Sequence, residues 1–248
     1  MSEYNPFSLL GKNILITGAS SGIGRAIAIE CSKMGAICLI TGRNEERLKE
    51  TLGKMEGDGH QWVVADMRND RNVIVDRVQK IDGVVHCAGV ADTMLFQYVD
   101  DQKLRDVMEI NFFIPAQLSR DLLSQKKLNK AASIIFISSI SGVKCSWIGN
   151  SVYSASKGAI NGLVKGMALD LASKGIRVNS VTPGMIDTDF LKEGLISEEQ
   201  LEIDRKKYPL KRYGRPEEVA YCVIFLLSDT TAWITGSNLL IDGGYTVQ

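Results

Sequence analysis

Short apolar runs alternate with segments of helical character along the chain. Brief runs rich in Ile, Val and Leu are typical of strands buried in a sheet. Strands that alternate with helices form a mostly parallel sheet covered on both faces, with the ligand site at the carboxyl ends of the strands. The runs predict seven strands: Asn13–Thr17, Ala36–Thr41, Trp62–Asp66, Ile81–His86, Ala132–Ser139, Arg177–Thr182 and Asn238–Asp242.

Composition narrows the class of protein. The 248 residues are 45% hydrophobic and contain no linker, repeat or low-complexity tract, which predicts one domain over residues 1–248. A net charge of zero offers no field to attract nucleic acid or acidic lipid. Five cysteines without a C-x-x-C pair, beside only two histidines, argue against a zinc site or disulfides. Neither a signal pattern nor a run of ~20 apolar residues is present, so we expect a soluble, cytoplasmic protein that binds neither nucleic acid nor membrane.

A glycine-rich turn joins the first predicted strand to a helix. The residues are Gly18-Ala-Ser20-Ser21-Gly22-Ile23-Gly24, and helical character follows from Arg25. In this context backbone amides at the helix N-terminus face a pyrophosphate. The spacing is G-x-x-x-G-x-G, so the prediction of nucleotide binding depends on the flanking strand and helix.

The end of the second strand bears on the choice of cofactor. A carboxylate there would hold the ribose diol of NAD and repel a 2′-phosphate. The chain instead has Arg43, with no acid before Glu45. A guanidinium group pairs well with a phosphate, so NADP is favoured and NAD stays possible. The alternative is that Arg43 is an ordinary solvated loop residue.

Several polar residues have two interpretations each. Asp66 is placed to accept a hydrogen bond from adenine or to cap the next helix. Asn111 lies inside a predicted helix near Gln102–Leu123, where asparagine is a poor helix former, so it either serves a site or is tolerated. Ser138 and Ser139 end the fifth strand, where each either serves a site or caps the strand.

The motif Ser151-Val-Tyr153-Ser-Ala-Ser-Lys157 carries the candidate chemistry. A tyrosine and a lysine four residues apart lie on one face of a helix. A nearby ammonium group stabilises the phenolate, so such a pair can give a proton to a carbonyl oxygen or take one from an alcohol. By itself the pair is equally consistent with two solvated surface residues. The glycine turn for nucleotide binding elsewhere in the chain is what favours a catalytic role.

Taken in order, these motifs resemble the short-chain dehydrogenase/reductase family from about Lys12 to the C-terminus. The motifs that carry the resemblance are Thr17-Gly-Ala-Ser-Ser-Gly-Ile-Gly24, Asn111, Ser138-Ser139, Tyr153-x-x-x-Lys157, Pro183-Gly184 and Asp242-Gly-Gly. Among its branches the chain looks most like 3-oxoacyl-(acyl carrier protein) reductase. The resemblance implies a Rossmann-type doubly wound sheet of about seven mostly parallel strands with helices on both faces.

The resemblance also implies residue roles. Tyr153 is the proton donor or acceptor, Lys157 supports it and holds the nicotinamide ribose, Ser139 binds the reacting oxygen, and Asn111 anchors a water in a proton relay. The expected catalytic set is Asn111, Ser139, Tyr153 and Lys157. The expected cofactor-binding set is Gly18, Ser20, Ser21, Gly22, Ile23, Gly24, Arg43, Asp66, Met67, Cys87, Ala88, Gly89, Tyr153, Lys157, Pro183, Gly184, Ile186 and Thr188. No metal is expected.

The chain departs from the family pattern after the fourth strand. His86-Cys87 replaces the usual pair of asparagines, whose hydrogen bonds cysteine cannot reproduce well. We therefore expect intact catalysis but weaker local stability. The segment between Asp66 and Asp82 is also short, so its helix is expected to lose a turn.

Two further segments concern substrate and assembly. Residues 185–215 are expected to form a lid over substrate, with Trp147, Ile148, Met185, Phe190 and Leu191 either lining the site or packing in the core. Glycines at 158, 162 and 166 suggest that the sheet or a second subunit approaches the helix closely. The resemblance favours a homotetramer.

Three functions remain open at this point. The first is NADPH-dependent reduction of a ketone, such as a 3-oxoacyl thioester carried by acyl carrier protein. The second is an NAD(P)-dependent alcohol, sugar or steroid dehydrogenase, and the third is a nucleotide sensor without catalysis. For the first, Lys130 and Lys174 are expected at the rim of the site, where they would attract an acidic carrier protein. The alternative is that they are ordinary exposed lysines at helix ends, which are common without any partner.

Overall fold

A parallel sheet of seven strands forms the centre of the molecule. The computed structural model describes residues 4–91, 93–188 and 197–248. The strand order is β3-β2-β1-β4-β5-β6-β7, and every pairing is parallel. The strands are β1 (Asn13–Thr17), β2 (Ile37–Gly42), β3 (Gln61–Val64), β4 (Ile81–His86), β5 (Leu128–Ile137), β6 (Arg177–Pro183) and β7 (Asn238–Ile241). The predicted sheet of about seven strands is thereby confirmed.

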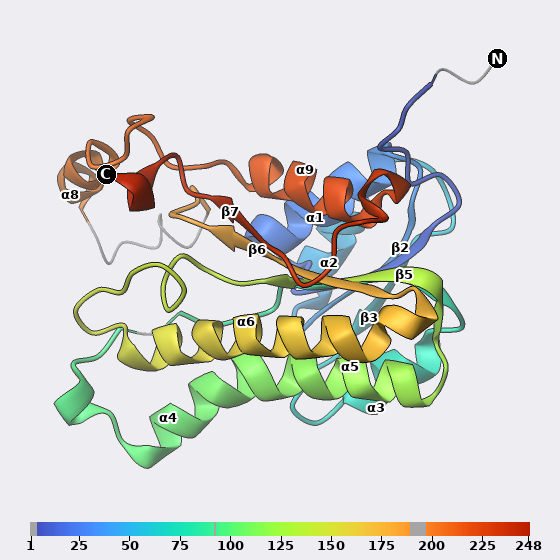
Figure 1. The fold of residues 1–248 in the computed structure, drawn as a ribbon, viewed down its shortest axis with the longest axis horizontal. Helices are drawn as coiled ribbons and strands as arrows, with labels where there is room; N and C mark the ends of the chain where they lie inside the picture. Colours follow the sequence, from blue (N-terminus) through green and yellow to red (C-terminus); the bar gives the residue numbers. More distant parts are fainter. Residues whose placement is uncertain (1–3, 92, 189–196) are drawn as a thin grey trace.

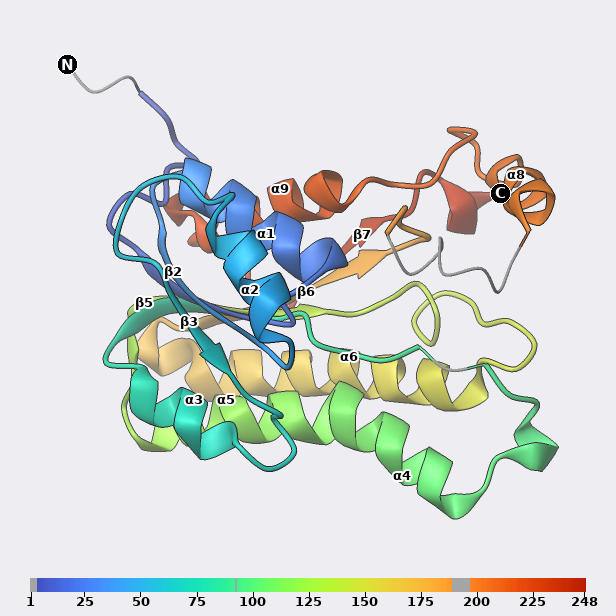
Figure 2. The same ribbon diagram turned by 180° about the vertical axis from the view of Figure 1, so that it is seen from behind.

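Helices cover both faces of this sheet (Figures 1 and 2). One layer contains α1 and α9 and the other contains α3 to α6, as the two views show. The helices are α1 (Gly22–Lys33), α2 (Glu45–Leu52), α3 (Arg71–Arg77), α4 (Asp101–Met108), α5 (Ile114–Ser124), α6 (Ser151–Leu171), α8 (Glu198–Arg205) and α9 (Pro216–Leu227). Short 3-10 turns are η1 (Phe96–Tyr98), η3 (Ala172–Lys174), η4 (Asp229–Thr231) and η5 (Tyr245–Val247), and η2 (Glu109–Phe113) is a π-helical turn.

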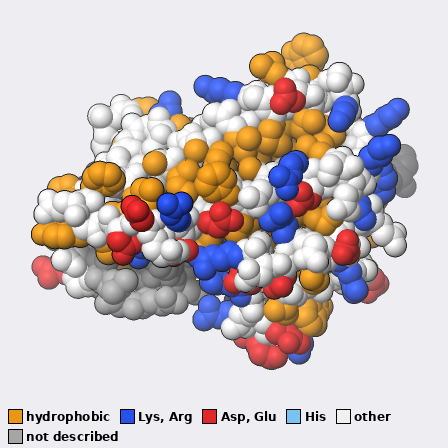
Figure 3. Space-filling view, turned by 90° about the horizontal axis from the view of Figure 1, so that it is seen from below, with side chains coloured by type: hydrophobic (Ala, Val, Ile, Leu, Met, Phe, Trp, Pro, Cys, Tyr) orange, Lys and Arg blue, Asp and Glu red, His pale blue; other side chains and the backbone are white. Residues whose placement is uncertain are grey.

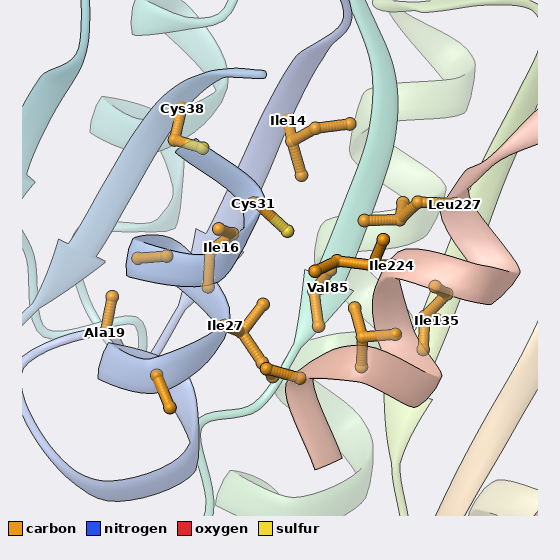
Figure 4. Close-up of a cluster of buried hydrophobic side chains, with 14 of the residues drawn as sticks. Ile14, Ile16, Ala19, Ile27, Cys31, Cys38, Val85, Ile135, Ile224 and Leu227 are labelled. Carbon is orange, nitrogen blue, oxygen red and sulfur yellow. The ribbon is translucent and has the colours of Figure 1, made fainter. Parts of the chain in front are cut away.

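Each helical layer encloses its own apolar core against the sheet. In one core, Ile27 of α1 and Ile224 of α9 pack against Ile16, Val85 and Ile135 of the central strands (Figure 4). The second core lies between the same strands and the helices α3, α5 and α6. Strands buried on both faces explain the continuous apolar runs in the sequence.

Two predicted elements differ from the observed ones. The helix expected near Gln102–Leu123 consists of α4, the π-helical turn η2 and α5, and Asn111 lies in η2. Strand β5 begins at Leu128, four residues before the predicted start at Ala132, because a bulge shifts its register against β4. Ala131 in that bulge has a positive φ of 62°.

Among the described residues, none of the helices has the length and apolar character needed to cross a bilayer.

Candidate active site

The glycine turn after β1 presents bare backbone at the carboxyl edge of the sheet. Gly18 has a φ of +70°, and a Cβ atom placed on it would lie 2.8 Å from the backbone N of Ala88. A Cβ atom on Gly24 would lie 2.3 Å from the carbonyl oxygen of Gly18. Side chains are therefore excluded at both positions. Ser21 precedes α1 in an extended conformation and makes no side-chain capping bond, so the first amides of α1 face an open N-terminus. This arrangement fits a pyrophosphate.

Thr17 ties the ends of β1 and β4 together. Its Oγ1 accepts hydrogen bonds from the amides of Cys87 at 3.1 Å and Ala88 at 3.3 Å. The same hydroxyl donates to the carbonyl oxygen of Val85 at 3.4 Å. This role is not evident from the sequence, because a lone threonine at a strand end carries no signal of its own. The bond to the Cys87 amide is independent of the side chain at position 87.

His86 fills the place of the first missing asparagine with a buried ring. The ring stacks on Phe136 with centroids 4.7 Å apart, and its Nε2 lies 2.8 Å from Ser119 Oγ. The Ser119 hydroxyl donates its only hydrogen to the carbonyl oxygen of Pro115, so Nε2 of His86 is the donor in that pair. Burial lowers the pKa of His86 to about 3 and raises that of the Cys87 thiol to about 12, so both are neutral near pH 7.

The expected cofactor residues at β2 and β3 lie at the same edge. Arg43 is exposed just after β2 and makes no hydrogen bond or ion pair with the described residues. A Cβ atom on its neighbour Gly42 would lie 3.2 Å from Ser20 Oγ, so the end of β2 adjoins the glycine turn. The side chain of Asp66 accepts a hydrogen bond from the amide of Arg68 at 3.1 Å. This bond closes a turn in the segment that precedes α3. Met67 is half-buried against the core.

Lys157 connects the start of α6 to the end of β5. Its Nζ donates to the carbonyl oxygen of Ile137 at 2.9 Å and lies 5.7 Å from the centroid of the Tyr153 ring. The lysine is 6% exposed, which is low for a charged side chain. A Cβ atom on Gly89 would lie 3.5 Å from this Nζ and 3.1 Å from Asn111 Oδ1, so glycine leaves the space between them open.

Asn111 is held by a hydrogen-bond network with Val90 and Ser156, to which the sequence had assigned no role. Its Oδ1 accepts from the amide of Val90, and its Nδ2 donates to the carbonyl of the same residue, both at 2.9 Å. Nδ2 also donates to Ser156 Oγ at 3.0 Å, and that hydroxyl donates to the carbonyl oxygen of Tyr153 at 2.7 Å. The π-helical turn η2 places Asn111 here, as such turns often do at functional sites.

The structure separates the two serines that end the fifth strand. Ser138 is 4% exposed and donates to the carbonyl oxygen of Lys157, while Asn161 donates to it. Ser138 therefore secures α6 to the sheet. Ser139 is half-buried, and its Oγ accepts a hydrogen bond from the amide of Ser141 at 3.1 Å.

Residues after β6 complete this edge of the sheet. The carbonyl oxygen of Pro183 accepts from the amide of Ile140 at 3.0 Å, and the amide of Gly184 donates to Ile241 at 2.9 Å. Ile186 is buried. Thr188 meets the glycine turn, because a Cβ atom on Gly22 would lie 3.4 Å from its Cγ2.

Part of the expected lid lies within the described residues. Phe190 and Leu191 lie outside them. The described lining residues Trp147, Ile148 and Met185 are 41%, 87% and 38% exposed, which excludes the alternative that they pack in the core.

The expectation that Lys130 and Lys174 lie at the rim of the site is wrong. Lys130 is near the amino end of β5, and Lys174 follows the C-terminus of α6 in η3. The 21 residues of α6 separate η3 from the helix start that carries Tyr153, a span of about 30 Å at ~1.5 Å per residue. The two lysines belong to the opposite edge of the sheet.

Comparisons with known proteins show the family to which the chain is similar. The profile of a family described as enoyl-(acyl carrier protein) reductase matches residues 18–246. The chain is 38% identical to a 3-oxoacyl-[acyl-carrier-protein] reductase from Rickettsia conorii, over 95% of this chain and 97% of that protein. It is 35% identical to a tropinone reductase homolog from Arabidopsis thaliana, over 98% and 94% respectively. A crystal structure of a dehydrogenase/reductase from Sinorhizobium meliloti matches with a TM-score of 0.86 and 33% identity, over 97% of each chain.

The chain belongs to the short-chain dehydrogenase/reductase family and is an oxidoreductase. Its family uses NAD(P)H in general.

Proposed function

We propose that this enzyme reduces a ketone, in the form of a 3-oxoacyl thioester, to the hydroxyl with NADPH. The observation that carries the proposal is the convergence of Tyr153, Lys157, Ser139 and Asn111 at the sheet edge that also holds the glycine turn. The thioester is favoured because the Rickettsia conorii relative is named as a 3-oxoacyl-[acyl-carrier-protein] reductase. An acyl carrier protein is therefore the proposed partner.

The residues at this edge fit the cofactor along its whole length. The N-terminus of α1 and the glycine turn would hold the pyrophosphate. Arg43 would pair with the 2′-phosphate, because its guanidinium has no other partner among the described residues. Asp66 and Met67 would adjoin the adenine, Cys87, Ala88 and Gly89 the middle of the cofactor, and Pro183, Gly184, Ile186 and Thr188 the nicotinamide.

When bound, the nicotinamide of NADPH would supply a hydride to the carbonyl carbon. The phenol of Tyr153 then gives its proton to the oxygen, so that one hydride and one proton convert the ketone to an alcohol. Ser139 donates a hydrogen bond to that oxygen, which stabilises the charge that develops on it. Lys157 stabilises the phenolate that Tyr153 becomes and binds the ribose. Asn111, whose side chain is fixed by Val90 and Ser156, would anchor a water in the relay that returns a proton to Lys157.

An assay of NADPH oxidation tests the proposal. The substrates are acetoacetyl thioester and a panel of simple ketones, sugars and steroids, each also offered as the alcohol with NADP and NAD. We expect the thioester to give the highest kcat/KM. Turnover of another ketone or of an alcohol alone would assign the enzyme to a different branch. Binding of NADPH without any turnover would favour a nucleotide sensor.

We further propose that the chain assembles as a homotetramer in the cytoplasm. Within one chain, Gly158 approaches the carbonyl oxygen of Gly142, which explains that glycine. A Cβ atom on Gly162 or Gly166 would meet nothing within 4 Å, so the sheet of the same chain does not require them. Hydrophobic side chains also gather on the face of the molecule that Figure 3 shows, on the side of α4, α5 and α6. Exposed apolar residues of these helices include Leu104 of α4 and Leu169 of α6. Light scattering measures the mass directly, and a monomer would contradict the proposal.

A further inference from the structure

The C-terminal turn is secured to the sheet by the carboxylate of Asp242. Its Oδ1 accepts from the amide of Gly244 at 2.9 Å, and its Oδ2 accepts from the amide and the hydroxyl of Thr246 at 2.9 and 2.7 Å. The side chain of Gln248 donates to the carbonyl oxygen of Lys207 at 2.6 Å. These bonds fix the turn η5 and, with it, the position of Tyr245.

Aromatic rings lead from Gly184, beside the expected nicotinamide, to the loop that follows Ser139. Tyr208 lies against Gly184, since a Cβ atom there would be 3.4 Å from its Cε1, and its hydroxyl accepts from the amide of Met185 at 3.2 Å. The ring centroids of Tyr208 and Tyr245 are 4.7 Å apart, and those of Tyr245 and Trp147 are 6.0 Å apart. Trp147 Nε1 donates to the hydroxyl of Tyr245 at 3.3 Å. We name Tyr208, Tyr245 and Trp147 the aromatic wall.

Trp147 is close to the catalytic helix as well as to the C-terminal turn. The preceding residue, Ser146, is hydrogen-bonded to Ser154 at 2.7 Å, and Ser154 adjoins Tyr153 on α6. Ser141, which binds Ser139, is also 2.7 Å from Ser154. The loop that carries Trp147 is therefore joined both to α6 beside Tyr153 and to the segment that begins at Ser139.

The wall is apolar and becomes more exposed toward its outer end. Tyr208 is 3% exposed, Trp147 is 41% exposed, and the adjacent Ile148 is 87% exposed. Lys207, which lies near Tyr245, forms an ion pair with Asp204 at 3.0 Å, and the Asp242 carboxylate is bound within the C-terminal turn. When an alkyl chain covers a rigid apolar surface that is partly exposed to solvent, the free energy of the complex is lowered.

We propose that Trp147 and Tyr245 determine chain-length specificity, by forming the surface on which the alkyl part of the substrate lies. The proposal rests on the proposed reduction of 3-oxoacyl thioesters. Each methylene that is fully buried on the wall raises kcat/KM by about fourfold, the ratio that corresponds to its transfer from water. Longer acyl chains are then preferred over acetoacetyl until the chain passes Ile148.

The test compares 3-oxoacyl thioesters of increasing chain length in wild type, Trp147→Ala and Tyr245→Phe. We expect Trp147→Ala to reduce kcat/KM for 3-oxodecanoyl thioester at least ~tenfold more than for acetoacetyl thioester, because it loses the apolar contact. Tyr245→Phe keeps the ring and loses only the link to Trp147, so its effect should be smaller. The matched control is Trp233→Ala, since Trp233 is 99% exposed in the segment before β7, at the opposite edge of the sheet.

Equal losses at all chain lengths, or no loss, would overturn the proposal. A binding measurement separates this failure from failure of the proposed function. In the double variant Trp62→Phe, Trp233→Phe, Trp147 is the last of the three tryptophans, and saturated decanoyl thioester should change its fluorescence while acetyl thioester does not. If no 3-oxoacyl thioester is reduced, the proposed function fails. Whether or not the thioester is reduced, an unchanged Trp147 fluorescence with decanoyl thioester would overturn the proposal for the aromatic wall.

Discussion

The ammonium group of Lys157 lies 5.7 Å from the centre of the Tyr153 ring, one helical turn away on α6. The bond of this Nζ to the carbonyl oxygen of Ile137 holds it beside the Tyr153 ring. We expect Tyr153→Phe to keep the fold and NADPH binding while lowering kcat by ~10²–10⁴, the range for loss of a positioned acid. Tyr221→Phe, on the exposed side of α9, is the control. Unchanged kcat in Tyr153→Phe would remove this residue from the mechanism.

Arg43 is the residue expected to favour NADPH over NADH. The variant Arg43→Ala should weaken NADPH binding by a factor of roughly ten to one hundred and leave NADH almost unaffected, since a hydrogen bond to a charged group contributes ~1.5–3 kcal/mol. Titration of both cofactors by fluorescence measures the two Kd values. Lys54→Ala, beyond the far end of α2, removes one positive charge elsewhere. Equal losses for both cofactors would show that Arg43 has a structural role.

His86 should make the protein less stable in mild acid. The folded state has a pKa of about 3 at His86 because the ring is buried, whereas the unfolded chain has a value near ~6.5. Between these values the unfolded state binds more protons, so stability falls as the pH falls below ~6.5. Urea denaturation at about pH 7.5 and about pH 5 measures the loss. We expect His86→Asn, which cannot be protonated, to lose about 2 kcal/mol less than wild type over that interval. Identical losses would contradict this account.

Substitution of Lys130 and Lys174 tests both the proposed homotetramer and the proposed binding of an acyl carrier protein. In one subunit Lys174 lies about 30 Å from Tyr153, well beyond the ~8 Å Debye length at physiological salt, and Lys130 lies near the amino end of β5, at the same far edge of the sheet. The double variant Lys130→Glu, Lys174→Glu should therefore leave KM unchanged for acetoacetyl thioester and for a carrier-linked substrate. A rise in KM for the carrier-linked substrate alone, largest at low salt, would place these lysines beside the site of another subunit.

Much of the fold follows from the sequence because local signals and topology agree. Buried parallel strands produce continuous apolar runs, and a glycine turn between strand and helix identifies the nucleotide edge. Tyr153 and Lys157 share a helix, so their proximity depends only on helical geometry. The family resemblance selected Ser139 and Asn111.

The tertiary structure decided what depends on contacts between distant segments. Ser138 is occupied by Lys157 and Asn161, and Thr17 holds the end of β4, neither of which a local pattern reveals. The contact of Trp147 with Tyr245 joins residues 98 positions apart and requires both loops to be folded. Lys130 and Lys174 were misplaced because a basic residue looks the same at either end of a strand or helix. The direction in which α6 and β5 run across the sheet determines the edge at which these side chains lie.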